Sequence, residues 1–350
     1  MFPTRCKILA ARPLFWLPLS LIKGVQGQDG NLNMGIMVQG KWQTEEFAER
    51  NRKGSYIRTT TTFRNWIGDD DFPAEADRYH LIVAHACPWA HRTMIFRALK
   101  GLEDVISATF VEPLMVDNGW EFTAGGDPVT GAQYTHQIYA KAAPDYSGRC
   151  SVPILWDKKS ETIVSNESSE IIRMLNGAFN HFAAYSIPDL YPEDLRAEID
   201  AVNEVVYNNI NNGVYRTGFA TTQNAYEEAF SDLFTALDQM EARLEGQRYL
   251  TGARITEADW RLFATLIRFD TVYVGHFKCN RQPISDYSNL SNYMRELYQW
   301  PGIAQTVDMP RIKQHYYSSH LAINPFGIVP SGPNQDLNAS HDRNRLSSAP

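Results

Sequence analysis

The sequence has few cysteines and keeps them far apart. Four occur in 350 residues, and they are Cys6, Cys87, Cys150 and Cys279. This spacing excludes both a cysteine metal cluster and a dense disulfide framework. The chain therefore suits a reducing compartment, where thiols stay free, and we expect no bound metal ion.

Positive charge is also scarce. The chain has 33 Lys and Arg against 40 Asp and Glu, a net charge of −7, and its basic residues form no cluster. These features argue against a nucleic-acid-binding surface. No apolar run is long enough to span a bilayer, so we expect neither nucleic acid nor a membrane as partner. A hydrophobic content of 43% is ample for the packed cores of two domains.

The first 28 residues contain no Asp or Glu. They carry four basic residues among apolar ones, a composition typical of an organelle transit peptide. The apolar run 14–22 also resembles part of a secretory signal, and a merely disordered start is the third alternative. The expected location is the cytoplasm, with mitochondrial targeting by residues 1–28 as the alternative.

Composition and periodicity divide the remainder of the chain into two domains with flanking segments. An α/β domain is expected first, and an all-α domain follows it. The expected parts are an irregular extension (29–78), the α/β domain (79–177), a linker (178–192), the helical domain with a terminal arm (193–330) and a disordered tail (331–350).

The α/β domain should contain four strands and two helices. A strand at 81–85, a helix to about residue 99 and a strand at 105–111 predict a parallel pair with a crossover. Residues 112–150 are expected to form a long loop. Strands at 151–157 and 162–164 follow, and Ser165 with Asn166 is the expected cap of the second helix.

The first strand of this domain ends at a cysteine that begins a helix. Pro88 suits the first helical position, which places Cys87 at the N-cap. Unpaired amides and the helix dipole favour a thiolate there, and a thiolate is the nucleophilic form. Ala90 occupies the position of a second cysteine, so an outside thiol would have to resolve any disulfide. The alternative is an inert buried cysteine.

Two further positions could bind a ligand of this thiol. Pro153 heads a strand, and a cis bond there would present the backbone N–H and C=O of Val152; an ordinary trans proline is the alternative. Glu167 and Ser168 precede the second helix, where they could bind an ammonium and a carboxylate or simply cap the helix.

Three aromatic residues are ambiguous from sequence. Trp120 and Tyr215 fit either a ligand site or the core, and Tyr215 follows an expected helix break at 211–213. Tyr316 and Tyr317 lie in a segment dense in titratable groups. By contrast, Thr256 and Asp259 form a predicted capping box, which is a structural feature.

Several blocks, taken together, resemble the glutathionyl-hydroquinone reductases, also called Xi-class glutathione transferases. The similarity covers about residues 30–333. The matching blocks are 87–92 (CPWAHR), 117–122 (DNGWEF), 151–157 (SVPILWD), 165–171 (SNESSEI), 313–317 (KQHYY), 323–325 (INP) and 327–330 (GIVP). The resemblance implies a thioredoxin-like N-terminal domain, an all-α glutathione-transferase C-terminal domain and a homodimer.

The resemblance also implies roles for individual residues. Cys87 matches the catalytic cysteine, and Tyr215 and Tyr316 match tyrosines of the electrophile pocket. The residues implied to bind glutathione are Trp120, Val152, Pro153 beside it in a cis bond, Glu167 and Ser168.

The predicted function is glutathione-dependent reduction of glutathionyl-hydroquinones. Cys87 would take the glutathionyl group as a mixed disulfide, and a second glutathione would release it. One alternative is an omega-like thioltransferase or dehydroascorbate reductase that uses the same cysteine. Another is a non-catalytic scaffold with this fold, although the intact Cys87, Glu167 and Ser168 weigh against it.

Overall fold

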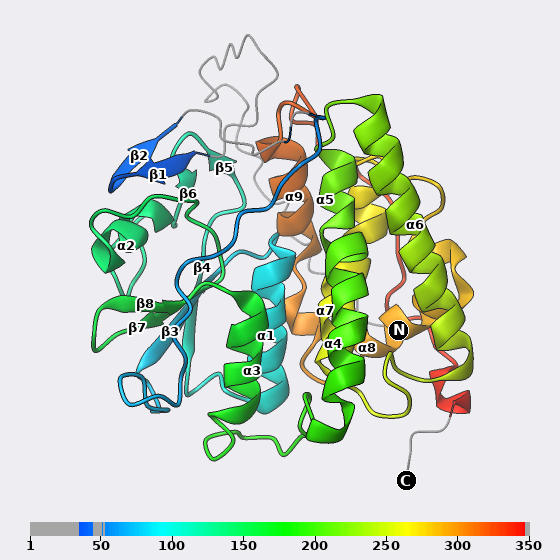
Figure 1. Ribbon diagram of the computed structural model, residues 1–350, viewed down its shortest axis with the longest axis horizontal. Helices are drawn as coiled ribbons and strands as arrows, with labels where there is room; N and C mark the ends of the chain where they lie inside the picture. The colour runs from blue at the N-terminus through cyan, green and yellow to red at the C-terminus, as the bar shows by residue number, and fades with distance from the viewer. Residues whose placement is uncertain (1–34, 45–50, 52, 347–350) are drawn as a thin grey trace, which may run out of the picture.

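The computed structural model describes residues 35–44, 51 and 53–346. Two lobes lie side by side (Figure 1): an N-terminal lobe built on a sheet and a C-terminal lobe built from helices. The first 28 residues, which carry the targeting prediction, lie outside the described residues. Among the described residues, no helix is both long and apolar enough to cross a membrane.

Four strands form the sheet of the first lobe, in the order β4-β3-β7-β8. They are β3 (Tyr79–Val83), β4 (Ser107–Phe110), β7 (Ile154–Asp157) and β8 (Thr162–Ser165). β3 and β4 are parallel, as the strand–helix–strand pattern predicts, and the other two pairs are antiparallel. Every residue of β3 is buried, so this strand is the centre of the lobe.

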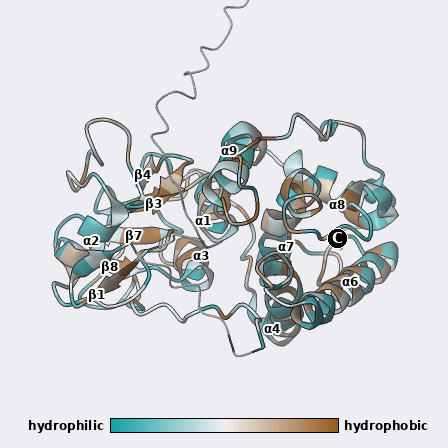
Figure 2. Cartoon of the chain, turned by 90° about the horizontal axis from the view of Figure 1, so that it is seen from above, coloured by the Kyte–Doolittle hydropathy of each residue, from teal (hydrophilic) through white to brown (hydrophobic). Residues whose placement is uncertain are grey.

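Helices α1 (Pro88–Lys100) and α3 (Ser168–Gly177) pack against each other between the sheet and the helical lobe (Figures 1 and 2). The cap of α3 differs from the prediction. Its N-cap is Glu167, and Ser165 instead accepts a hydrogen bond from the Glu167 amide. α1 ends at Gly101, whose φ of 61° is the left-handed conformation that glycine adopts most readily.

The insert at 112–150 is more ordered than a loop. It forms a short hairpin, β5 (Met115–Val116) with β6 (Gly119–Trp120), and a helix, α2 (Thr135–Ala142). These elements are short and lack a long hydrophobic period, which is why the sequence pattern did not reveal them. The hairpin contacts the C-terminal lobe, since the amide of Met115 donates to Ser319.

The N-terminal extension begins with a hairpin, β1 (Ile36–Val38) with β2 (Lys41–Gln43). Residues 53–67, here named the bridging segment, then cross from the helical lobe to the sheet lobe (Figure 1). Gly54 lies against Thr221 so closely that an added Cβ would be 2.6 Å from its hydroxyl oxygen. At the other end, the amide of Asn65 donates to the carbonyl of Val164 in β8.

In the part of the chain that the structure describes, the helical lobe contains four α-helices beyond its first element, which is one helix with a π-helical interruption. That first element comprises α4 (Arg196–Val205), η3 (Val206–Asn211) and α5 (Gly213–Gly218). The expected break at 211–213 is therefore a π-helical turn. The other α-helices are α6 (Gln223–Gly246), α7 (Glu257–Arg268), α8 (Ser288–Tyr298) and α9 (Met309–Ser319), with a second π-helical turn, η4 (Phe269–Tyr273), directly after α7.

Short 3-10 turns precede three of these helices, at η2 (Glu193–Leu195), η5 (Ile284–Asp286) and η6 (Ala304–Thr306), and another, η7 (Arg343–Arg345), lies in the C-terminal segment. The capping box before α7 is confirmed. The Thr256 side chain accepts from the N3 backbone, and Asp259 accepts from the Thr256 amide. Both residues are fully buried, so they stabilise the helix start and are remote from solvent.

The prediction that residues 331–350 form a disordered tail is wrong for residues 331–346, the part that the structure describes. Residues 331–346 pack along the helical lobe, with Leu337 against the core. Arg343 is fully buried and donates to three carbonyls, those of Leu244, Gln247 and Arg248. A polar composition predicts disorder, but one arginine can satisfy several helix-end carbonyls at once, and this anchors the segment.

Candidate active site

Cys87 lies where the sequence predicts it, at the N-cap of α1. Its Sγ accepts from the amide of Ala90 at 3.5 Å and donates to the carbonyl of Val152 at 3.3 Å. The side chain is half-buried, and its own amide donates to Ala84. The sulfur therefore contacts both a helix N-terminus and the turn before β7.

The pKa of the Cys87 thiol shifts in the direction opposite to the prediction. Burial raises the pKa of its thiol above the ordinary value, and this effect outweighs the factors that lower it. Those factors are the amides of Ala90 and Trp89 and the positive charges of Arg58 and Arg268. The helix N-terminus thus lowers the pKa of the thiol as expected, but burial between the two lobes raises this pKa by more.

The peptide bond between Val152 and Pro153 is cis. Val152 is buried, and its carbonyl accepts from the Cys87 thiol. Nearby, the hydroxyl of Tyr139 donates to the carbonyl of Ser151 and holds the turn. The backbone of Val152 is therefore placed at the sulfur, as the sequence predicts.

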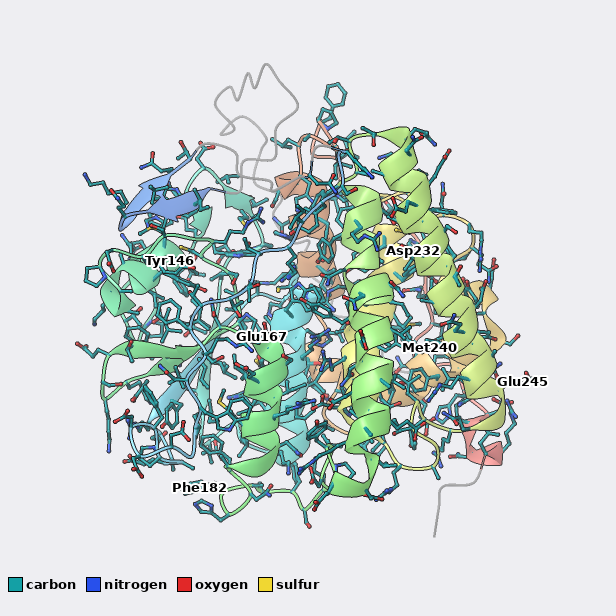
Figure 3. All side chains as sticks on the ribbon, viewed as in Figure 1. Tyr146, Glu167, Phe182, Asp232, Met240 and Glu245 are labelled. Carbon is teal, nitrogen blue, oxygen red and sulfur yellow. The ribbon has the colours of Figure 1, made fainter. Side chains whose placement is uncertain are left out.

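Glu167 and Ser168 stand at the start of α3, on the boundary between the lobes (Figure 3). Burial raises the pKa of Glu167, but hydrogen bonds from Ser169 and Thr61 and the charge of Arg92 together hold it below its ordinary value. The carboxylate is therefore ionised at neutral pH. Its side chain caps the helix and is only half-buried, so helix capping and binding of an ammonium are compatible roles for Glu167.

Arg92 connects Ser168 to the helical lobe. Its guanidinium donates to the Ser168 hydroxyl at 3.4 Å and to Asn211 in η3 at 2.6 Å. Burial lowers the pKa of Arg92 to about 9, so it stays charged at neutral pH. A buried positive charge at this helix start adds to the attraction for a carboxylate.

Three tyrosine hydroxyls meet in the helical lobe, and the charge of the cysteine acts on two of them, those of Tyr215 and Tyr273. Tyr316 in α9 is 2.6 Å from Tyr215 in α5 and 3.2 Å from Tyr273 in η4. Tyr316 is buried, whereas Tyr215 is partly exposed. Burial raises the pKa of Tyr215, and a charge on Cys87 raises it further, so the phenol stays protonated while the thiol ionises.

The structure distinguishes the two adjacent tyrosines of α9. Tyr317 points away from the tyrosine cluster, and its hydroxyl donates to the carbonyl of Thr271. Trp120 also packs on α9, where its ring stacks on His315 at 4.7 Å between centroids. The Trp120 side chain is 8% exposed, because it is packed between β6 and α9.

Comparison with known proteins places this geometry in a family. Residues 86–178 match the N-terminal domain model of the glutathione S-transferases, and residues 223–296 match the C-terminal domain model. The glutathionyl-hydroquinone reductase YqjG of Escherichia coli is 49% identical over 324 residues, covering 89% of this chain and 98% of that protein. The chain belongs to the glutathionyl-hydroquinone reductases.

Solved structures agree with this assignment. A Xi-class glutathione transferase of Natrialba magadii superposes with a TM-score of 0.84 at 47% identity, covering 91% of this chain and 98% of that one. The glutathione-bound structure of YqjG gives 0.81 at 48% identity, covering 89% and 99%. The predicted fold, a thioredoxin-like domain followed by a helical glutathione-transferase domain, is confirmed.

Two site residues were missed by sequence reasoning in this reductase. Tyr273 completes the tyrosine cluster, and Arg268 contacts the backbone just before Cys87. Tyr273 is in an apolar helical run, where a core tyrosine is the usual interpretation. Arg268 did carry a signal, because a charged residue at the end of the apolar run 262–267 needs polar partners once it is buried.

The described residues also form two cavities that Cys87 does not line. Their volumes are about 550 and 440 Å³, and neither is lined by Cys87 or the tyrosine cluster. Both lie under the C-terminal segment, and they share the lining residues Thr271, Pro333, Gln335 and Leu337. Within the described ranges, no three His, Cys, Asp or Glu side chains are grouped to hold a metal ion.

Proposed function

We propose that this reductase removes glutathione from glutathionyl-hydroquinones through a Cys87–glutathione mixed disulfide. One observation carries the proposal: a lone thiol at a helix N-terminus touches the Val152 carbonyl, and its charge acts on Tyr215 and Tyr273 of a cluster of tyrosine hydroxyls. The thiol can attack sulfur, the backbone can hold the departing tripeptide, and a phenol can supply a proton.

In the first step, the Cys87 thiolate attacks the sulfur of the glutathionyl-hydroquinone. The sulfur–aryl bond breaks, the aryl carbon takes a proton, and a disulfide forms between Cys87 and glutathione. A second glutathione thiolate then attacks this disulfide, which gives oxidised glutathione and regenerates the Cys87 thiolate. The net reaction oxidises two glutathionyl sulfurs and reduces one carbon–sulfur bond, and its kinetics should be ping-pong.

Glutathione binding follows from the residues around the thiol. The ionised Glu167 matches the ammonium of the γ-glutamyl unit, and Ser168 with Arg92 matches its carboxylate. The backbone of Val152 can pair with the cysteinyl unit, as in an added β-strand. Pro153 beside it and Trp120 complete the proposed glutathione site.

Tyr215 is the proposed proton donor. Tyr215 is the partly exposed residue of the cluster, its hydroxyl bonds to that of Tyr316, and the Tyr316 hydroxyl in turn bonds to that of Tyr273. A buried phenol that stays protonated beside a thiolate is suited to general acid catalysis. Tyr316 orients the Tyr215 hydroxyl and can return its proton.

The test is a steady-state assay of glutathionyl-menadione reduction, following both the hydroquinone and oxidised glutathione. Cys87→Ala should abolish both products. Cys279→Ala is the matched control, because Cys279 is a free cysteine buried in the helical lobe. Retained activity in Cys87→Ala would show that another group attacks the sulfur. Dehydroascorbate and a small mixed disulfide, assayed in parallel, test the omega-like alternative.

We also propose a homodimer. The terminal arm and the nearby hairpin expose several apolar side chains, which are Leu114 (41%), Val116 (49%), Leu321 (38%), Phe326 (86%) and Ile328 (67%). Exposed apolar groups of this kind often mark an interface. Sedimentation analysis should give a dimer mass for the wild type and a monomer mass for Phe326→Glu. A wild-type monomer would contradict the proposal.

For location, we propose the cytoplasm, with mitochondrial import by residues 1–28 as the alternative. Support comes from the thiols of Cys87, Cys150 and Cys279, which are free, and from the need for a supply of reduced glutathione. Mass spectrometry of the N-terminus of protein isolated from its source distinguishes the two, because import would remove the first residues.

A further inference from the structure

Arg268 is a buried arginine that connects the two lobes at the nucleophile. It is the last residue of α7 and is fully buried. Its Nε donates to the carbonyl of Ala86 at 2.9 Å, and one terminal nitrogen donates to the carbonyl of His85 at 2.7 Å. The guanidinium fork of one lobe thus holds the two peptide groups that immediately precede Cys87 in the other.

The other terminal nitrogen of Arg268 extends this contact into α1. It donates to Nδ1 of His91 at 3.0 Å and to the carbonyl of Ala264 at 2.6 Å. A guanidinium only donates, so Nδ1 of His91 must be the acceptor and Nε2 must carry the proton. Nε2 then donates to the hydroxyl of Thr306 at 2.8 Å. The cysteine loop and the first turn of α1 are therefore both oriented by one side chain.

The charge of Arg268 has no carboxylate partner among the residues that the structure describes. All four of its hydrogen bonds go to neutral groups. A buried charge is costly unless an opposite charge offsets it. The Cys87 thiol directly follows the held loop and can become an anion, and the positive charge of Arg268 favours its ionisation, in addition to the larger effect of Arg58. Asp308 is a second anionic group near the loop, and its charge acts on His85.

We propose that Arg268 is a positioning residue for Cys87, which both fixes the loop before the cysteine and supplies the buried positive charge that the thiolate balances. This inference rests on the proposed role of Cys87 as nucleophile. When the thiol ionises, its proton passes to solvent and the unbalanced guanidinium gains a counter-ion. The other titratable or charged groups that bear on the Cys87 thiol are Arg58 of the bridging segment, Tyr215 of α5 and Tyr273 of η4.

The first test measures the thiol directly, without any quinone substrate. The full-length reduced protein is alkylated with iodoacetamide across a range of pH, and the Cys87 peptide is followed by mass spectrometry. Arg268→Gln should raise the midpoint of the rate–pH curve by about one unit, which is about a tenfold slower reaction at pH 7. An unchanged midpoint in a folded Arg268→Gln protein would overturn the electrostatic part of the proposal.

The matched control is Arg343→Lys. Arg343 is also fully buried and donates to three backbone carbonyls, but these lie in the helical lobe. Arg343→Lys should lower the free energy of unfolding without moving the midpoint of the rate–pH curve. If Arg343→Lys moves it as far as Arg268→Gln does, general loosening explains the shift and the proposal fails.

Arg268→Lys separates positioning from charge and replaces Arg268→Gln if that variant does not fold. Lysine keeps the charge but cannot hold both carbonyls with one planar fork. The midpoint should stay near that of the wild type, while turnover of glutathionyl-menadione should fall at least tenfold. Full turnover would overturn the positioning role. Because alkylation needs no quinone, its result stands even if the proposed substrate is wrong.

Discussion

The hydroxyls of Tyr215 and Tyr316 are 2.6 Å apart, although 101 residues separate them in the chain. The two residues come from α5 and α9, so this hydrogen bond depends on the complete helical lobe. Tyr316 is buried and Tyr215 is partly exposed, which gives the pair an inner and an outer member. In the proposed mechanism, the outer member, Tyr215, donates the proton.

Removing the inner hydroxyl should slow the chemical step. Tyr316→Phe leaves Tyr215 without its closest partner, and we expect kcat for glutathionyl-menadione to fall roughly 10²-fold, the usual size of a general acid contribution. Tyr317→Phe is the control, because that hydroxyl bonds to the carbonyl of Thr271 outside the cluster. Equal losses in both variants would refute the assignment of Tyr316.

Replacing the carboxylate of Glu167 should weaken glutathione binding. Glu167→Gln keeps the size of the side chain but loses the charge that matches the glutamyl ammonium, and charge-assisted bonds of this kind predict a roughly 10- to 100-fold higher Kd. Calorimetric titration in a Cys87→Ser background measures binding without turnover. Glu170→Gln is the control, since Glu170 pairs with Arg64 on the next turn. The prediction is contradicted if Glu170→Gln raises the Kd and Glu167→Gln does not.

The buried Asp127 should make stability depend on pH in the acid range. Burial raises the pKa of this carboxyl, but the His80 ring 3.4 Å away and the hydrogen bonds from Thr130 dominate and lower it to about 2, below the ordinary 3.8. A lowered pKa stabilises the fold above about pH 4, and that stabilisation is lost as the pH falls towards 2. It amounts to about 2 kcal/mol.

Urea unfolding at several pH values measures this effect. Asp127→Asn should lower the free energy of unfolding at pH 7, and its difference from wild type should shrink below pH 4. Asp145→Asn is the control, because Asp145 is exposed. A difference that stays constant from pH 7 to pH 3 would mean that the carboxylate charge contributes nothing.

The C-terminal segment should contribute to stability through Arg343. Arg343→Met removes three hydrogen bonds from a charged donor to helix-end carbonyls, and we expect a loss of about 2 kcal/mol in the free energy of unfolding. Arg345→Met is the control, because Arg345 pairs with Asp342 at the surface. Equal unfolding midpoints for the two variants would show that the segment is only loosely attached.

Local patterns predicted much of this fold. The Cys87 N-cap, the parallel pair β3–β4 and the Thr256–Asp259 box all depend on a few neighbouring residues, and all three are confirmed. The errors arise where distant parts meet. The order of residues 331–346 depends on carbonyls about 100 positions earlier, which no local pattern contains.

The same distinction between local patterns and contacts of distant residues applies to the candidate active site. The sequence singles out the residues proposed to bind glutathione, because most of them stand at element ends with recognisable neighbours. It does not predict the rise in the pKa of Cys87, since burial depends on how the two lobes close around the thiol. Nor does it reveal which groups Arg268 contacts in the other lobe, because these precede it by more than 175 residues.

The bridging segment has a consequence for how the molecule unfolds. It bonds to Thr221 and Thr222 in the helical lobe and to Glu167 and Glu170 at the start of α3. Separating the lobes would break these contacts together with those of Arg268. The two domains should therefore lose structure in a single cooperative transition, and protection of Cys87 from alkylation in denaturant should report the stability of the whole molecule.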